Sequence, residues 1–243
     1  MSEAGITETT AGLMSMDLHL RRPWHLLNEE NVKFLNGVVT PEAVIYSLIR
    51  ANMARRHAAS YRMFNVGACG IVFRNDGSGR SLEHGANIKN GAGVAEVDKH
   101  AEKFIMDEVN KGDKLGALSV VAPLQEDSGS GKETPTLHPC YKCRQEILAG
   151  GQATENTLIV CANPGFTAVQ WGGVKDFIGF HADKDNQLQT ALFDETPELF
   201  RPTGLKPGEP IHLSDELDVD TVEWDRKVTF PLWKWIRQHQ VNT

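Results

Sequence analysis

The chain has 243 residues, of which 40% are hydrophobic and 23% are charged. This length fits one principal domain with additional segments, and the composition excludes a fibrous or wholly disordered chain. The formal net charge of −7, from 25 basic and 32 acidic residues, repels polyanions, so a small polar substrate fits better than bulk nucleic acid.

The N-terminal region is polar and shows no sustained period over its first 20 or so residues. We therefore expect residues 1–40 to form a partly disordered N-terminal arm. This region lacks the charged start and apolar block of a signal peptide, and no apolar run of the chain approaches the about 20 residues that span a bilayer. The expected location is cytoplasmic.

The first predicted element is a helix in residues 40–61. Thr40 can cap it, Pro41 suits the first helical position, and Glu42 complements the positive end of the helix dipole. Two apolar runs joined by the turn sequence NDGSG follow in residues 65–88 and predict a β-hairpin.

The pattern then returns to a helical period in residues 94–112, where Gly112 is expected to stop the helix. The sequences GALSVVAPL and NTLIVCA are buried-strand candidates, and a short helix is predicted between them from Cys140 to about Ala149. The order helix, strand, strand, helix, strand, helix, strand predicts a sheet with helices on its faces.

The domain organisation follows from these elements. Residues 41–182 are assigned to the main domain and residues 183–243 to a C-terminal extension that packs on it. A short helix is predicted near the end, in VTFPLWKWIRQHQ. The alternative for the extension is a lid or an oligomer contact.

The cysteines fall into two kinds. Cys69 and Cys161 lie in apolar strand-like runs and are expected to be core residues. Cys140 and Cys143 form a CxxC pair, which in an intracellular chain indicates metal or redox chemistry rather than a disulfide framework. At a helix start, free N–H groups and the dipole favour thiolates, a setting that suits zinc.

Two cysteines need a further zinc ligand, and His100 is the leading candidate. Glu102 follows it by two residues, and the later sequence PCYKC supplies the cysteines. A histidine ligand, a nearby glutamate that is not a ligand, and PCxxC form the signature of zinc deaminases. On these motifs the sequence resembles the cytidine deaminase superfamily. It resembles the free-nucleoside branch, with blasticidin S deaminase-like enzymes, more than the tRNA or polynucleotide branches.

Three further stretches carry the resemblance, which covers about residues 42–165: YRMFNVGACGIVF, GANIKNGAG and PCYKCRQE. It implies a three-layer α/β/α sandwich with a mixed, about five-stranded sheet. The partners that it implies are a small cytosine-type substrate and further copies of the chain in a dimer or tetramer. It also implies hydrolytic deamination of a cytosine-type nucleoside, with Zn²⁺ held by His100, Cys140 and Cys143 and with Glu102 as the proton shuttle.

The resemblance further implies a set of substrate contacts: Phe64, Asn87, Lys89 and Ala101. Lys89 departs from the family pattern, because the nucleoside enzymes usually have there a glutamate that accepts a hydrogen bond from the ribose. An ammonium group has three donors and no acceptor. This departure widens the candidate substrates to nucleotides, modified cytosine nucleosides and blasticidin-type antibiotics.

Several alternatives stay open. The cysteines can belong to a closed structural zinc site, with His138 or Cys161 as the fourth ligand. Asn87 can be a turn residue, and Phe64 can serve in core packing alone. Polynucleotide editing is a rival activity, although the acidic balance and the absence of an aromatic and basic strip disfavour it.

Overall fold

A computed structural model describes residues 39–60, 64–76, 80–89, 98–123, 135–177, 188–197 and 223–239. Almost all of the predicted N-terminal arm lies outside the described residues, as do Asn90 of the GANIKNGAG stretch and the polar loop before the PCxxC motif. The proposed domain boundaries stay predictions.

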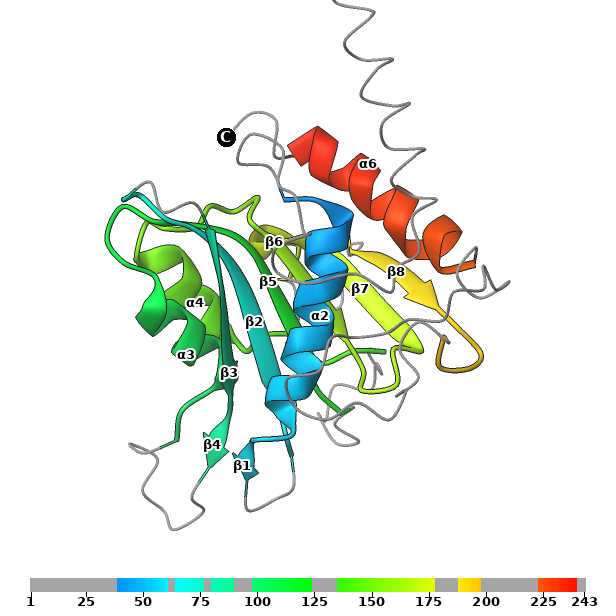
Figure 1. Cartoon of the computed structure of the whole chain (residues 1–243), viewed down its shortest axis with the longest axis horizontal. Coiled ribbons are helices and arrows are strands. Elements are labelled where there is room, and N and C mark those ends of the chain that lie inside the picture. The colour runs from blue at the N-terminus through cyan, green and yellow to red at the C-terminus, as the bar shows by residue number, and fades with distance from the viewer. Residues whose placement is uncertain are drawn as a thin grey trace, which may run out of the picture.

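Within these described ranges, the main sheet has six strands in the order β3-β2-β5-β6-β7-β8. Only β5 and β6 run parallel, and every other neighbouring pair is antiparallel, so the sheet is mixed as expected (Figure 1). The strands are β2 (Gly67–Phe73), β3 (Arg80–Ala86), β5 (Lys114–Val121), β6 (Leu158–Ala162), β7 (Ala168–Gly173) and β8 (Gln189–Leu192). A separate two-stranded sheet pairs β1 (Ala59–Ser60) with β4 (Ile88–Lys89) in parallel.

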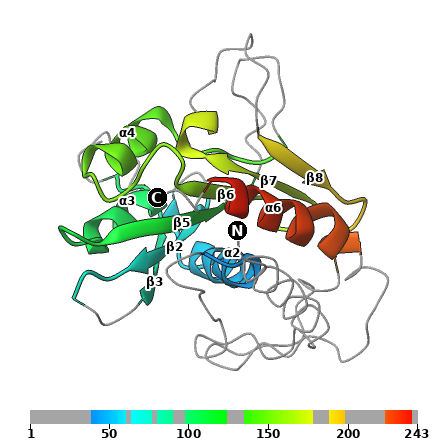
Figure 2. The ribbon, with the colours of Figure 1, turned by 90° about the horizontal axis from the view of Figure 1, so that it is seen from above.

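Helices cover both faces of the main sheet, which confirms the three-layer α/β/α arrangement (Figure 2). Alternate strand residues point to opposite faces. One face packs against α2 (Pro41–Arg55) and α6 (Phe230–His239). The other face packs against α3 (Ala101–Glu108), α4 (Tyr141–Ala149) and the short 3₁₀ helix η3 (Val174–Phe177).

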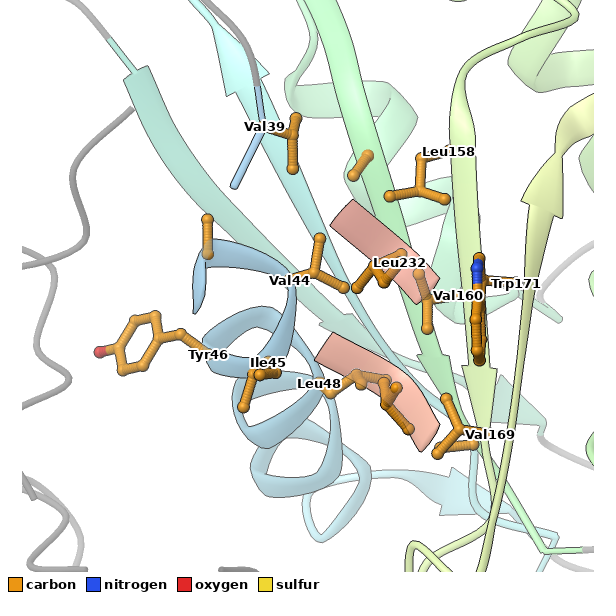
Figure 3. Close-up of a cluster of buried hydrophobic side chains, with 14 of the residues drawn as sticks. Val39, Val44, Ile45, Tyr46, Leu48, Leu158, Val160, Val169, Trp171 and Leu232 are labelled. Atoms are coloured by element: carbon orange, nitrogen blue, oxygen red, sulfur yellow. The ribbon is translucent and has the colours of Figure 1, made fainter. Parts of the chain in front are cut away.

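Helix α2 begins as the sequence predicts. The Ala43 amide donates to the Thr40 hydroxyl at 3.3 Å, and Pro41 occupies the first helical turn. Figure 3 shows Val44 and Leu48 of this helix facing the side chains of the sheet, among them Trp171. All three of these side chains are buried, so α2 anchors the apolar layer on this face.

Gly67 allows α2 and β2 to approach each other closely. A Cβ atom at this position would lie 2.0 Å from the Ala51 carbonyl oxygen and 2.5 Å from the Arg55 amide nitrogen. The close approach of the two backbones therefore requires a residue without a side chain at this position.

Helix α3 differs from its prediction. It begins at Ala101 rather than near residue 94 and ends at Glu108, so His100 is the N-cap and not a residue inside the helix. The prediction of an earlier start was wrong for residues 98–100 because the chain there is extended. Lys99 pairs with Ile88 in an isolated antiparallel bridge, and residues 94–97 lie outside the described part.

The C-terminal part contributes to the sheet and to the core. Strand β8 adds to the edge of β7, and Trp224, Leu232 and Trp235 join the apolar cluster around α2. The predicted terminal helix is confirmed as α6, which continues from a π-helical turn, η5 (Asp225–Thr229). Pro231 has no N–H to donate to the carbonyl four residues earlier, which accounts for a wider turn at this point.

The described part of the main sheet has six strands, whereas the sequence predicts about five. Strand β8, with the sequence QTAL, has only four residues and is too short to show an apolar alternation. None of the helices in the described ranges has the length and apolar character needed to cross a membrane.

Candidate metal centre and active site

Three side chains that the sequence predicts as zinc ligands meet in one cluster. The ligand atoms of His100, Cys140 and Cys143 all lie within 4.8 Å of one another. The His100 Nδ1 atom is 3.2 Å from the Cys143 sulfur and 3.5 Å from the Cys140 sulfur, and the two sulfurs are 3.5 Å apart. In a tetrahedral zinc site these separations are about 3.6 Å for nitrogen and sulfur and about 3.8 Å for two sulfurs. The donor set and its spacing therefore fit a zinc ion.

The position of His100 is fixed from two directions. Its backbone is extended, with φ of −77° and ψ of 152°, and it directly follows the Lys99–Ile88 bridge. The start of α3 also lies against β3 at Gly85, where a Cβ atom would be 2.9 Å from the Ala101 carbonyl oxygen. The absence of a side chain at Gly85 lets α3 approach the sheet and places the histidine beside α4.

The two cysteines are positioned by the start of α4. Cys140 is the N-cap of this helix, and the Cys143 amide nitrogen is 3.5 Å from the Cys140 sulfur. The turn before the helix is held by the buried Arg144, whose Nη1 donates to the Pro139 carbonyl oxygen at 2.5 Å. Because α4 connects the parallel strands β5 and β6, its start lies beyond the carboxyl end of β5, where open α/β sheets commonly bind ligands.

The two cysteines of the cluster shift each other's pKa values in opposite directions. The pKa of the Cys140 thiol is lowered, first by its hydrogen bond with Cys143 and also by the bond with His100. The pKa of Cys143 is raised by the same neighbouring sulfur and by burial. Two adjacent sulfurs without a cation thus retain one proton between them, and a divalent cation would allow both to ionise.

His100 and Lys89 also interact electrostatically. The pKa of His100 is raised, first by its hydrogen bond with Cys140, while burial and the charge of Lys89 act in the opposite direction. Lys89 therefore lies close enough to the cluster for its ammonium charge to act on the imidazole.

Glu102 lies beside the cluster without being part of it. Its side chain is buried, and its carboxylate forms a hydrogen bond with Cys143. Burial raises the pKa of Glu102 above its ordinary value, because a carboxylate removed from water is disfavoured relative to the neutral acid. A carboxyl group with a raised pKa next to a metal-binding cluster suits proton transfer in both directions.

His138 is not a fourth ligand. Its Nε2 lies 2.9 Å from the Gln170 side-chain oxygen, which also accepts a hydrogen bond from the Thr136 hydroxyl at 2.7 Å. Burial lowers the pKa of His138, so this network holds a neutral imidazole directly before Pro139. Sequence reasoning missed this support for the PCxxC turn. The available signal was Gln170 itself, a polar residue in a strand that is otherwise apolar and wholly buried.

Within the described part of the chain, no fourth histidine, cysteine or acidic side chain joins the three ligands. Cys161 and Cys69 are fully buried, which confirms their predicted place in the core. The closed structural site with His138 or Cys161 as a ligand is therefore not what these residues form.

The predicted substrate residue Asn87 lies in the interior. Its side-chain oxygen accepts from the Val66 amide at 2.7 Å, and its side-chain nitrogen donates to the Phe64 carbonyl oxygen at 2.9 Å. Asn87 therefore connects the segment before β2 to the start of β4. Phe64 is partly buried and packs against the apolar cluster of α3 and α4. The substrate contacts of both residues stay predictions.

The other two predicted substrate residues flank His100 from different elements. Lys89 is the last residue of β4 and is partly buried. Ala101 is fully buried at the first position of α3. The structure thus brings both close to the metal ligands, and their contacts with substrate stay predictions.

Comparisons with known proteins give similarities to solved structures only. No protein-family model matches the chain, and no curated protein matches it. The cytidine deaminase from Burkholderia pseudomallei is 22% identical with a TM-score of 0.42, and the match covers 56% of this chain and 96% of that one. The enzyme from Mycobacterium leprae is 24% identical with a TM-score of 0.38, covering 56% and 97%. The enzyme from Mycobacterium tuberculosis is 24% identical with a TM-score of 0.34, covering 56% and 93%.

All three solved proteins bear the name of the family that the HAE and PCxxC motifs resemble. The remaining part of this chain, more than two fifths of it, lies outside each of these matches.

Proposed function

We propose that the protein is a zinc-dependent hydrolase that deaminates a cytosine-type nucleoside. The observation that carries this proposal is the cluster of His100, Cys140 and Cys143 with the buried carboxyl group of Glu102 against it. Three protein ligands leave a tetrahedral metal with one open position, which is the arrangement of catalytic rather than structural zinc.

The residues would divide the reaction as follows. His100, Cys140 and Cys143 would hold a zinc ion, which when bound would lower the pKa of water to about 7 and so make hydroxide available at neutral pH. Glu102 would accept one proton of the attacking water and deliver it to N3 of the ring; it would then take the remaining proton from the new C4 hydroxyl and pass it to the departing amine. The C4–N bond breaks, a C4–O bond forms, and water and substrate become a uracil-type product and ammonia.

Two features support this proposal over its rivals. A redox CxxC does not require a histidine and a buried carboxyl group beside the two sulfurs. Editing of polynucleotides would favour a basic surface with stacking aromatic residues, whereas the chain has a formal net charge of −7. The homo-oligomer and the cytoplasmic location stay predictions.

The deciding experiment combines metal analysis with a substrate panel. Purified protein should bind about one zinc ion per chain, and the zinc-loaded protein should release ammonia from at least one cytosine nucleoside or nucleotide. Bound zinc without ammonia release from any cytosine compound would contradict the deaminase proposal. An exchangeable water in the spectrum of the cobalt-substituted protein would separately distinguish an open metal site from a closed one.

A further inference from the structure

We propose that Lys89 makes the site selective for an anionic substrate, namely a cytosine nucleoside that carries a phosphate or carboxylate group on its sugar. The ammonium group of Lys89 would form an ion pair with that group. This inference rests on the proposed function, because it assumes that the amino-bearing ring is held at the metal centre.

The backbone register fixes where Lys89 lies. Ile88 and Lys99 exchange two backbone hydrogen bonds, each of 2.9 Å, and thus form an antiparallel bridge. In this register residue 89 lies opposite residue 98, and residue 87 lies opposite residue 100. Strand β4 is in turn held by its parallel pairing with β1. The position of Lys89 relative to the metal ligands is therefore set by paired backbone on both sides.

The same register sets the side to which Lys89 points. Side chains alternate along extended backbone, so those of Lys89 and His100 belong to one side of the bridge, while Ile88 and Lys99 belong to the other. Diagonal neighbours of this kind have Cβ atoms about 7 Å apart. The effect of the Lys89 charge on the His100 imidazole agrees with this placement.

Lys89 differs from the other lysines near the cluster in having no anionic partner among the described residues. Lys99 and Lys103 both pair with Asp107, at 2.6 Å and 2.7 Å. The Asp98 carboxylate, opposite Lys89 in this register, is exposed and has interactions of its own. Among the described residues, Lys89 is therefore a partly buried lysine beside the cluster that forms no salt bridge, unlike Lys99 and Lys103.

The exposure of the cluster gives the direction of approach. Glu102 and Cys143 are only 5% and 4% exposed, whereas His100 and Cys140 are partly exposed. A substrate therefore reaches the metal position past His100, with its amino group innermost. The end of the substrate that remains outside then lies beside Lys89.

The positive charge of Lys89 indicates which chemical group this outer end of the substrate carries. A partly buried ammonium group gains a charge-assisted hydrogen bond from a phosphate or carboxylate, whereas a neutral sugar hydroxyl leaves its charge uncompensated. Such a bond changes relative affinity by about tenfold to a hundredfold. A charged group that is left unpaired when the wrong ligand binds weakens the binding of that ligand, and this is a general route to specificity.

The test compares kcat/KM for an anionic substrate with kcat/KM for its neutral counterpart, both measured on the zinc-loaded protein. We expect kcat/KM to be at least about tenfold higher for deoxycytidine 5′-monophosphate, or for the 5′-carboxylate of deoxycytidine, than for deoxycytidine itself. Comparison of the two anionic substrates shows whether Lys89 favours a phosphate or a carboxylate group. Lys89→Gln should bring the preferred ratio close to one. Lys99→Gln is the matched control, because it removes a lysine from the other side of the same bridge and should leave the ratio unchanged.

A ratio of one or less in the active natural protein, or a high ratio that Lys89→Gln does not reduce, would overturn the inference while leaving the deaminase proposal intact. If no compound is deaminated, calorimetric titration with deoxyuridine 5′-monophosphate and with deoxyuridine decides the matter. Tighter binding of the nucleotide that is lost in Lys89→Gln would support the anion site. Equal binding, or no binding, would refute it.

Discussion

The N-cap position has one role in α2 and another in α3 and α4. Thr40 caps α2 with a hydroxyl that accepts a hydrogen bond from the first turn. His100 caps α3 without any side-chain capping bond, whereas the sulfur of Cys140 accepts a hydrogen bond from the Cys143 amide at 3.5 Å. Histidine and cysteine are not among the favoured N-caps. Helix α3 thus lacks a side-chain cap and α4 has a cysteine cap, because these two positions hold candidate metal ligands at the positive ends of the helices.

The largest effect expected from this difference concerns the first turn of α3. Glu102→Gln keeps the size of the side chain but removes its ability to take up a proton, so we expect kcat to fall by about 10²–10⁴-fold with zinc still bound. Ammonia release and metal content should be measured together. Glu108→Gln, at the other end of the same helix, is the matched control and should remain active. An undiminished rate in Glu102→Gln would remove this residue from proton transfer.

The next largest effect is expected when His100, the proposed ligand at the N-cap of α3, is replaced by a residue that favours the N-cap position. Asparagine is a good N-cap and the extended backbone of residue 100 suits one, so His100→Asn should stabilise the metal-free protein by about 0.5–1 kcal/mol. The same variant should lose zinc affinity by at least about 100-fold. Urea unfolding with a chelator and competitive zinc titration measure the two quantities. His84→Asn, on exposed β3 surface, should change neither. A metal-free protein made less stable by His100→Asn would contradict the comparison.

A smaller effect is expected at α2, where the cap serves stability alone. Thr40→Ala removes the acceptor for the Ala43 amide and should lower the free energy of unfolding by about 1 kcal/mol. Zinc affinity should not change, because α2 lies on the opposite face of the sheet from the ligands. Thr40→Ser keeps the hydroxyl and serves as the control. Loss of zinc binding in Thr40→Ala would show that the two regions are not independent.

The smallest effect concerns a carboxyl group near the first turn of α2. The pKa of Asp225 is raised to about 6, first by burial and further by the charge of Glu42. The folded state then binds the proton more tightly than the unfolded chain, so this contribution to stability is full below the ordinary pKa and is lost as the pH rises through about 6. Asp225→Asn should flatten this dependence in urea unfolding at pH 5 and pH 7.5. An unchanged slope would contradict the raised pKa.

The sequence predicts those parts of the molecule that depend on local signals. The cap of α2 and the hairpin of β2 and β3 each have a turn or capping residue next to a clear apolar period, and the start of α4 is marked by the PCxxC motif. The cluster of His100, Cys140 and Cys143 and the place of Glu102 beside it could be found as well, because their motif has fixed spacing.

The parts that could not be predicted depend on contacts between distant segments. The late start of α3 follows from the pairing of Lys99 with Ile88, and the hydrogen bond between His138 and Gln170 joins residues 32 positions apart. Strand β8 exists because the edge of β7 is available to it, and its own residues are mostly exposed. No spacing rule in the sequence links any of these pairs.

The eight residues of α3 have a consequence for local unfolding. A helix this short is marginal by itself, so it is held by its buried residues against the sheet and, when metal is bound, by a coordination bond to a segment 40 residues away. Loss of the ion removes that bond and leaves the first turn without a side-chain cap. The amides of α3 should then be the first of the helical amides near the cluster to exchange with solvent, so hydrogen exchange at this helix would report the metal content of each molecule.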